Sequence, residues 1–302
     1  VLPVLLRPPE RTARHLAAWA SASWLGMLAF TGWAVQPAPA PAAAFVRVAP
    51  AVPHLDRFAG RVSEVRLDGA PTRGRTSAPI LAEALERRSV RLDADATVRT
   101  WTDQFAPIAD VVDAGWNPTL QLGQVGQKIV FSVRARSEAL RLRAPSVKVY
   151  RALPPPEGQP IEAGGALEGM ALSAYAIADG VEHRARTRLT PGLGWMLVLP
   201  LGFYPFDYRP DLTSAAWTAL PLLLVGFWAR RSGAAPFVVP GMAIVLALGL
   251  LAIPPLTGAG REGWVAWIAC ALALVGGWIS ARYASTVTVA EVPPSARSAS
   301  SP

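Results

Sequence analysis

Four stretches of the sequence are apolar enough and long enough to cross a lipid bilayer, and their spacing is uneven. They cover Leu16–Val35, Ser214–Ala229, Pro236–Leu256 and Gly263–Ala281. The hydrocarbon core of a bilayer is about 30 Å thick and takes about 20 apolar residues as a helix. The second stretch is the shortest and spans if its helix begins earlier or the bilayer thins locally. The pattern predicts one transmembrane helix before a long polar block and three after it.

The first apolar stretch has an alternative interpretation as a cleaved signal peptide, because Arg7, Arg11 and Arg14 precede it. Leu16–Val35 is longer than the apolar region of a usual signal peptide. We therefore favour a retained anchor at residues 16–35, after a basic cytoplasmic leader at residues 1–15.

The arginines outside the polar block indicate an orientation. With the N-terminus in the cytoplasm, four spans return the C-terminus there. Of the eight arginines outside residues 36–213, Arg261 then lies on the outer side. The other seven are then cytoplasmic: Arg7, Arg11, Arg14, Arg230, Arg231, Arg282 and Arg297. Cytoplasmic loops of membrane proteins carry an excess of arginine and lysine, so this distribution supports the orientation. The sequence thus predicts a multi-pass protein of the bacterial cytoplasmic membrane with its polar block outside and a flexible cytoplasmic tail at residues 282–302.

Charge and cysteine content argue against several functional classes. The net charge is +8, but residues 36–213 hold 21 basic and 18 acidic side chains. This small excess is not the strongly basic character expected of a nucleic-acid-binding domain. Cys270 is the only cysteine and falls in a predicted span, so no disulfide forms within the chain. The three histidines are scattered, and we expect no zinc or haem site.

Residues 45–191 show the alternation of short β-strands. Strands are expected within Arg61–Gly69, Ser89–Trp101, Thr119–Arg136 (as a pair) and Ser146–Leu153, and in a hairpin around Asp179-Gly180. This pattern predicts a β-sandwich or jelly roll. Ile80–Arg88 is the one helix candidate, and the Pro-rich Leu153–Gly169 reads as a loop.

Two connecting segments have their own character. Residues 36–44 form a Pro/Ala run, which predicts a semi-rigid spacer that lifts the β-domain off the membrane. Residues 192–213 are apolar but broken by Pro200 and Pro205, so we favour an interfacial or re-entrant segment over a span.

None of the four predicted spans contains a charged residue, which disfavours a transporter or channel. Small residues predict helix packing: Ala22, Gly26, Gly241, Gly249, Gly276 and Gly277. Aromatic residues predict anchoring at the two membrane interfaces: Trp19, Trp33, Trp195, Tyr204, Tyr208, Trp217, Trp228, Trp264 and Trp278. We expect bound lipid.

Two motifs resemble known families. Residues 119–136 are similar to the middle strands of a concanavalin A-like (laminin-G-type) domain, and Gly202-Phe-Tyr-Pro-Phe-Asp-Tyr208 is similar to the start of VanZ-like membrane segments. The resemblance implies an extracytoplasmic jelly-roll-like domain on a small helical membrane domain, with carbohydrate or protein ligands and sometimes calcium. The chain departs from the pattern in its shortened β-domain and its three distal spans.

Two pairs of acidic residues are candidates for a calcium site. Calcium needs several converging oxygens, and the available pairs are Asp93 with Asp95 and Asp110 with Asp113. The first pair lies on the strand face opposite Val90, so a solvated face is the favoured interpretation. No catalytic signature is present, and no cofactor is expected.

Two functions remain, neither of them enzymatic. The favoured one is a non-catalytic accessory subunit of a bacterial membrane complex, such as a respiratory or photosynthetic one, whose β-domain clamps neighbouring subunits. The alternative is a membrane-anchored module that recognises envelope glycan or protein.

Overall fold

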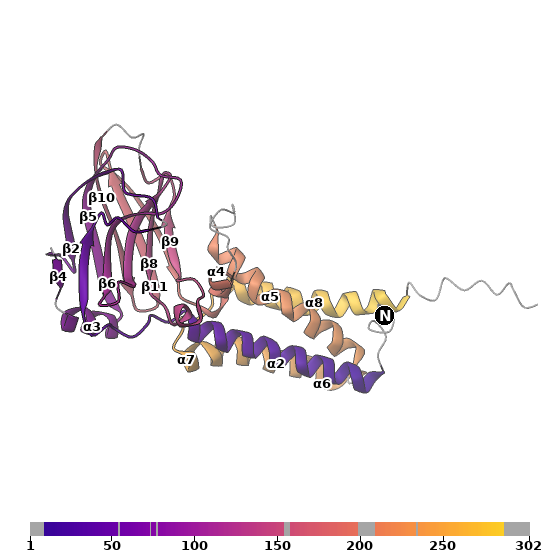
Figure 1. Cartoon of the computed structure of the whole chain (residues 1–302). Helices are drawn as coiled ribbons and strands as arrows, with labels where there is room; N and C mark the ends of the chain where they lie inside the picture. The colour runs from indigo at the N-terminus through magenta and orange to yellow at the C-terminus, as the bar shows by residue number, and fades with distance from the viewer. Residues whose placement is uncertain are drawn as a thin grey trace, which may run out of the picture.

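The computed structural model describes residues 9–53, 55–72, 74–76, 78–153, 158–198, 209–233 and 235–286. These residues form a β-domain and a bundle of helices that projects from one end of it (Figure 1). Figure 1 also shows the strands running across the direction of the helices.

The β-domain contains two antiparallel sheets of six strands each. Sheet 1 has the strand order β4 (Gly74–Thr76), β1 (Ala44–Val48), β6 (Ala106–Asp113), β7 (Pro118–Val125), β8 (Lys128–Val133) and β9 (Ser146–Val149). Sheet 2 has the order β12 (Val181–Arg188), β11 (Ala171–Ala178), β10 (Gln159–Glu168), β5 (Ser89–Val98), β2 (Gly60–Leu67) and β3 (Ala70–Pro71). The expectation of an all-β domain is confirmed at this level.

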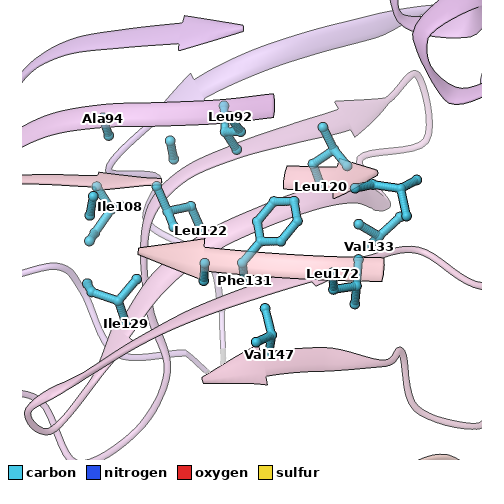
Figure 2. Close-up of a cluster of buried hydrophobic side chains, with 14 of the residues drawn as sticks. Leu92, Ala94, Ile108, Leu120, Leu122, Ile129, Phe131, Val133, Val147 and Leu172 are labelled. Atoms are coloured by element: carbon cyan, nitrogen blue, oxygen red, sulfur yellow. The ribbon is translucent and has the colours of Figure 1, made fainter. Parts of the chain in front are cut away.

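One apolar core joins the two sheets. Phe131 on β8 is fully buried, and Figure 2 shows its ring among side chains of both sheets, including Leu122 from sheet 1 and Leu92 and Leu172 from sheet 2. Burial of such side chains is the main stabilising term in a domain without disulfides. The same core extends into the connection to the helices through Leu193 and Leu197.

Strands appear where the alternation predicts them, at β2, β5, β7, β8, β9, β11 and β12. The β11–β12 hairpin turns at Asp179 and Gly180, both at positive φ (52° and 73°), which Asp and Gly accept more readily than other residues. Helix α3 (Ala78–Glu86) occupies the predicted helical segment.

The prediction of a loop over Leu153–Gly169 is wrong from Gln159 onward, because β10 pairs with both β5 and β11. Its sequence lacks a regular apolar face because two glycines lie at its centre. A Cβ at Gly165 would overlap the ring of Phe131, and one at Gly164 would overlap Asp93 and Tyr175. Glycine is required here so that large neighbours can lie against the strand.

The helical part contains α2 (Glu10–Ala34), α5 (Pro210–Arg231), α6 (Ala235–Ala247), a π-helical turn η4 (Leu248–Ala252), α7 (Ile253–Thr257) and α8 (Trp264–Thr286). Short helices lie near the β-domain: η1 (Arg136–Leu140), η2 (Pro191–Leu193) and α4 (Gly194–Val198). Helix α5 packs along α8 and α2. Trp24, Leu28, Leu222 and Leu274 are among the residues of their shared core.

Three helical segments are long and apolar enough to cross a membrane: Pro210–Arg231, Phe237–Thr257 and Trp264–Tyr283. Their outward side chains Leu220, Phe237, Leu256 and Leu272 are each more than half exposed. Apolar surface of this extent is unusual for a soluble monomer and indicates association with a membrane.

The first apolar stretch differs from the prediction. Helix α2 begins at Glu10 instead of Leu16, so part of the expected leader is helical, and it is not apolar enough to count with the other three. Its serines and three indoles lower its hydropathy. Arg7 lies outside the described residues, as do residues 287–302 of the expected tail, while α8 continues past residue 282.

The Pro/Ala run at residues 36–44 does not act as a free spacer. Pro37 bridges to Ala135, and the Ala38 N–H donates to the Arg134 carbonyl at 2.8 Å. The run therefore lies against the β-domain, because the segment between β8 and η1 offers a backbone partner to the Ala38 amide, which would otherwise be unpaired.

The small residues divide into two groups. Gly249 lies against Trp24, and Gly277 lies against the Leu223 carbonyl, where no Cβ would fit; a Cβ at Gly276 would only touch Leu223. Gly226, which the sequence pattern did not single out, lies as closely against the Leu274 carbonyl. Gly26 and Gly241 have nothing within 4 Å of a Cβ position, and Ala22 is exposed. No described neighbour of Gly26 or Gly241 requires a glycine there, and the packing role of these three residues stays a prediction.

Gly226→Ala should separate α5 from α8, because the new methyl group would overlap the Leu274 carbonyl. Overpacking of this kind costs about 1–3 kcal/mol. Gly26→Ala is the matched control, and it should be neutral or stabilising because alanine favours helix formation. Thermal unfolding in detergent measures both variants, and equal midpoints would contradict this packing.

Candidate functional site

The outer face of sheet 2 carries a cluster of paired ionic side chains. Asp93 on β5 is only 4% exposed and lies beneath Arg91, whose Nε contacts Asp93 Oδ2 at 2.8 Å. The prediction of a solvated face is therefore wrong for Asp93. The alternation is correct, since Asp93 does point away from the core, but neighbouring side chains cover it.

Arg66 on β2 gathers three further carboxylates. Its guanidinium forms a fork with Asp95, with distances of 2.7 and 3.1 Å, and contacts Glu64 at 2.9 Å. Glu162 on β10 lies 3.6 Å away. The planar guanidinium favours such two-pronged contacts with carboxylates.

Tyr175 on β11 connects the two halves of this cluster. Its hydroxyl lies 2.9 Å from Asp93 Oδ1 and 2.9 Å from Glu162 Oε1, and it accepts from Arg91 Nη2 at 3.0 Å. Burial and the two carboxylates raise the pKa of the phenol above its ordinary range. The phenol therefore keeps its proton, and one proton can serve only one of the two carboxylates at a time.

An open hollow of 790 Å³ lies over this cluster. Arg66, Arg87, Arg91, Asp93 and Glu162 contribute to its lining. It offers several carboxylate acceptors and guanidinium donors at fixed positions on a rigid sheet. Such a surface can bind a polar ligand.

The second pair of calcium candidates is engaged elsewhere. Asp110 is fully buried on β6 and forms a fork with Arg47, with contacts of 2.8 and 2.5 Å. Asp113 accepts from the backbone of Gly115 and Asn117 and pairs with Arg134 at 2.7 Å. Within the described ranges, no three His, Cys, Asp or Glu side chains are placed to hold a metal.

The β-domain and the helices meet through specific polar contacts. The Gln36 side chain donates to the Thr257 carbonyl and accepts from Arg88 Nη2 at 3.1 Å. Arg88 also donates to the Gly258 carbonyl at 3.1 Å. One arginine, two residues after α3, thus ties the segment that follows α2 to the turn after α7.

A second set of contacts joins the loop before α8 to the segment after β12. Glu262 accepts from the Gly192 N–H at 2.6 Å and from the Thr190 hydroxyl. Burial raises the pKa of Glu262 above its ordinary value. We name the contacts of Gln36, Arg88 and Glu262 the junction.

Trp195 is not an interfacial anchor, contrary to the prediction. It is 1% exposed, and its indole N–H donates to the Ser214 hydroxyl at 3.0 Å. Helix α4 places it against the start of α5, so it packs at the junction. Tyr204 and Tyr208 lie outside the described residues.

The other predicted anchors lie near both ends of the helices. Trp33 and Trp264 are exposed, at 38% and 73%, at the end nearest the β-domain, where Trp217 is half-buried. Trp228 and Trp278 are half-buried at the opposite end, and Trp19 is exposed along α2. Their contact with a bilayer stays a prediction.

The described arginines of the predicted cytoplasmic side gather at one end of the bundle. Arg14 Nε donates to the Ser232 carbonyl at 3.1 Å, and Arg230 lies over the Trp278 ring at 4.8 Å. Arg11 is one turn from Arg14, Arg282 is one turn beyond Trp278, and Arg231 follows Arg230. Figure 1 shows this end of α2 and α8 as the one farthest from the β-domain.

The sequence pattern did not single out Tyr175, Arg66 or Glu162 as site residues. A weak signal existed in β5, where Arg91, Asp93 and Asp95 alternate on one face. Tyr175 on β11 and Asp93 on β5 are brought together by β10, where Gly164 pairs with both of them. Because the sequence of β10 predicts a loop, the sequence does not indicate that Tyr175 and Asp93 meet.

Tyr175→Phe should destabilise the β-domain by about 1–3 kcal/mol, because buried Asp93 would lose a donor without gaining another. Denaturant unfolding of the variant measures this loss. An unchanged midpoint would contradict the assigned hydrogen bonds.

Stability should depend on pH through Glu262. The pKa of Glu262 in the folded state lies above the ordinary carboxyl value of 4.5. Its contribution to folding stability is therefore fully present below pH 4.5 and is lost as the pH rises through the raised pKa. As the pH rises from 4.5 through the raised pKa, the melting temperature of the wild type should therefore fall relative to that of Glu262→Gln. Glu168→Gln, at an exposed position, should keep the wild-type pH profile; parallel profiles for all three would contradict the assignment.

Comparison of the chain with protein-family models, with curated proteins and with solved structures found no match to any of them.

Proposed function

We propose that the chain is a non-catalytic, membrane-anchored recognition protein whose sheet 2 face binds a polyhydroxylated ligand of the bacterial envelope. The observation that carries this proposal is the shared phenol proton between Asp93 and Glu162. The carboxylate that does not receive the proton retains an acceptor for a ligand hydroxyl or amide.

Accessibility supports binding from solution. The side chains of Glu64, Asp95 and Glu162 are 42%, 35% and 41% exposed, so a ligand reaches them without opening the sheet. Arg66 contacts all three and holds them in place, which lowers the entropy cost of binding. Sugars present the hydroxyl donors and acceptors that this surface matches, and the resemblance to concanavalin A-like domains supports the same ligand class.

The membrane arrangement is part of the proposal. Four helices, with α2 beside α5, cross the bacterial cytoplasmic membrane, and the β-domain lies outside. Support comes from the arginines at the end farthest from the β-domain, which match the bias of cytoplasmic loops. The burial of Trp24 against α5, with its indole N–H donating to the Thr218 carbonyl at 2.7 Å, supports including α2.

The binding proposal is tested with soluble peptidoglycan fragments titrated into the purified full chain. Glu162→Gln should weaken binding about tenfold, the value of one hydrogen bond to a charged group. Asp103→Asn removes the same charge from an exposed loop and should bind as the wild type does. Absence of binding to the wild type, or equal affinity of both variants, would overturn the proposal.

A second candidate function is an accessory subunit of a larger membrane complex, in which the β-domain also contacts neighbouring subunits. The specific observation in its favour is that Ala22 and Gly26, one turn apart on α2, are both exposed. Small residues on an outward face allow another helix to approach closely.

Purification in mild detergent followed by mass analysis separates the two functions. A stoichiometric set of co-purifying chains, lost in Gly26→Leu but kept in Leu220→Ala, would support the subunit. A monomer that binds envelope fragments would support the recognition protein alone.

A further inference from the structure

A cationic groove of 640 Å³ lies where the two sheet edges meet the start of α5. Its described lining includes five cationic side chains and one carboxylate, that of Asp211. The cationic residues are Arg143, Lys148, Arg184, Arg186 and Arg209.

Two of the arginines, Arg184 and Arg186, pair with acidic side chains only weakly. Arg184 pairs with Glu182 at 2.7 Å and Arg186 with Glu168 at 3.8 Å, and all four side chains are largely exposed. Exposed pairs of this kind contribute little and are screened by salt. The groove therefore keeps a positive potential that an anion would satisfy.

The position of the groove indicates which kind of anion it binds. Strands β9 and β12 are the terminal strands of sheet 1 and sheet 2, and Pro210 and Asp211 form the first turn of α5, where a candidate span begins. Figure 1 shows β9 on the side of the β-domain that faces the helices, with the strands running across the helix direction. If α5 crosses a bilayer, these cations lie at the level of the lipid headgroups.

We propose that this groove binds the phosphate of an anionic phospholipid, such as phosphatidylglycerol, in the leaflet below the β-domain. The guanidinium fork matches two phosphate oxygens, and lysine supplies a point charge. The groove requires the membrane arrangement proposed above but not the ligand on sheet 2, so either binding site can fail alone. Bound lipid would hold the free sheet edges against the membrane surface.

The test uses the full chain in detergent, with phosphatidylglycerol or phosphatidylcholine added and retained lipid counted by native mass spectrometry. Arg143→Gln with Arg209→Gln should reduce retained phosphatidylglycerol about fivefold or more, since each cation near an anionic surface contributes a factor of that order. Retained phosphatidylcholine should not change.

Arg61→Gln with Arg99→Gln is the matched control, because it removes the same charge from two exposed positions away from the groove. Arg61 lies at the start of β2, and Arg99 directly follows the end of β5. It should retain phosphatidylglycerol as the wild type does, including any lipid held by the arginines at the far end of the bundle. Equal retention by the two double variants would overturn the proposal. Soluble glycerol phosphate binding as tightly as phosphatidylglycerol would overturn the lipid assignment.

Discussion

The orientation of the β-domain on the helices depends on a few polar contacts at the junction. Gln36 and Arg88 together satisfy two carbonyls at the end of α7, and Glu262 holds the segment that leads into α4. These groups are partly withdrawn from water, where an unmet hydrogen bond is costly. The junction therefore converts two separately packed cores into one unit, and the groove between the sheet edges and α5 follows from that geometry.

Much of the fold can be predicted from the sequence, because its signals are local. The Asp179-Gly180 turn and the alternation in β5 depend only on neighbours along the chain. Three helices follow from uninterrupted apolar runs. Strand β10 escapes prediction because Gly164 and Gly165 are explained only by side chains that pack over them from other strands.

The candidate site was less accessible to sequence reasoning than the fold. The acidic residues of β5 could be placed on the correct face, but their solvation could not. Asp93 is covered by Arg91 and Tyr175, and the latter lies 82 residues away in the chain. The same limit applies to Trp195, whose burial against Ser214 requires α4 to fold back onto α5. Long-range pairing of polar groups decides these cases.

The central claim is that the junction fixes the β-domain rigidly to the helices. Pulsed electron paramagnetic resonance between nitroxides at Val181→Cys and Phe237→Cys tests it directly in a Cys270→Ala background, since both positions are exposed. A rigid junction predicts a single narrow distance distribution in lipid nanodiscs. A broad or multi-peaked distribution would contradict it.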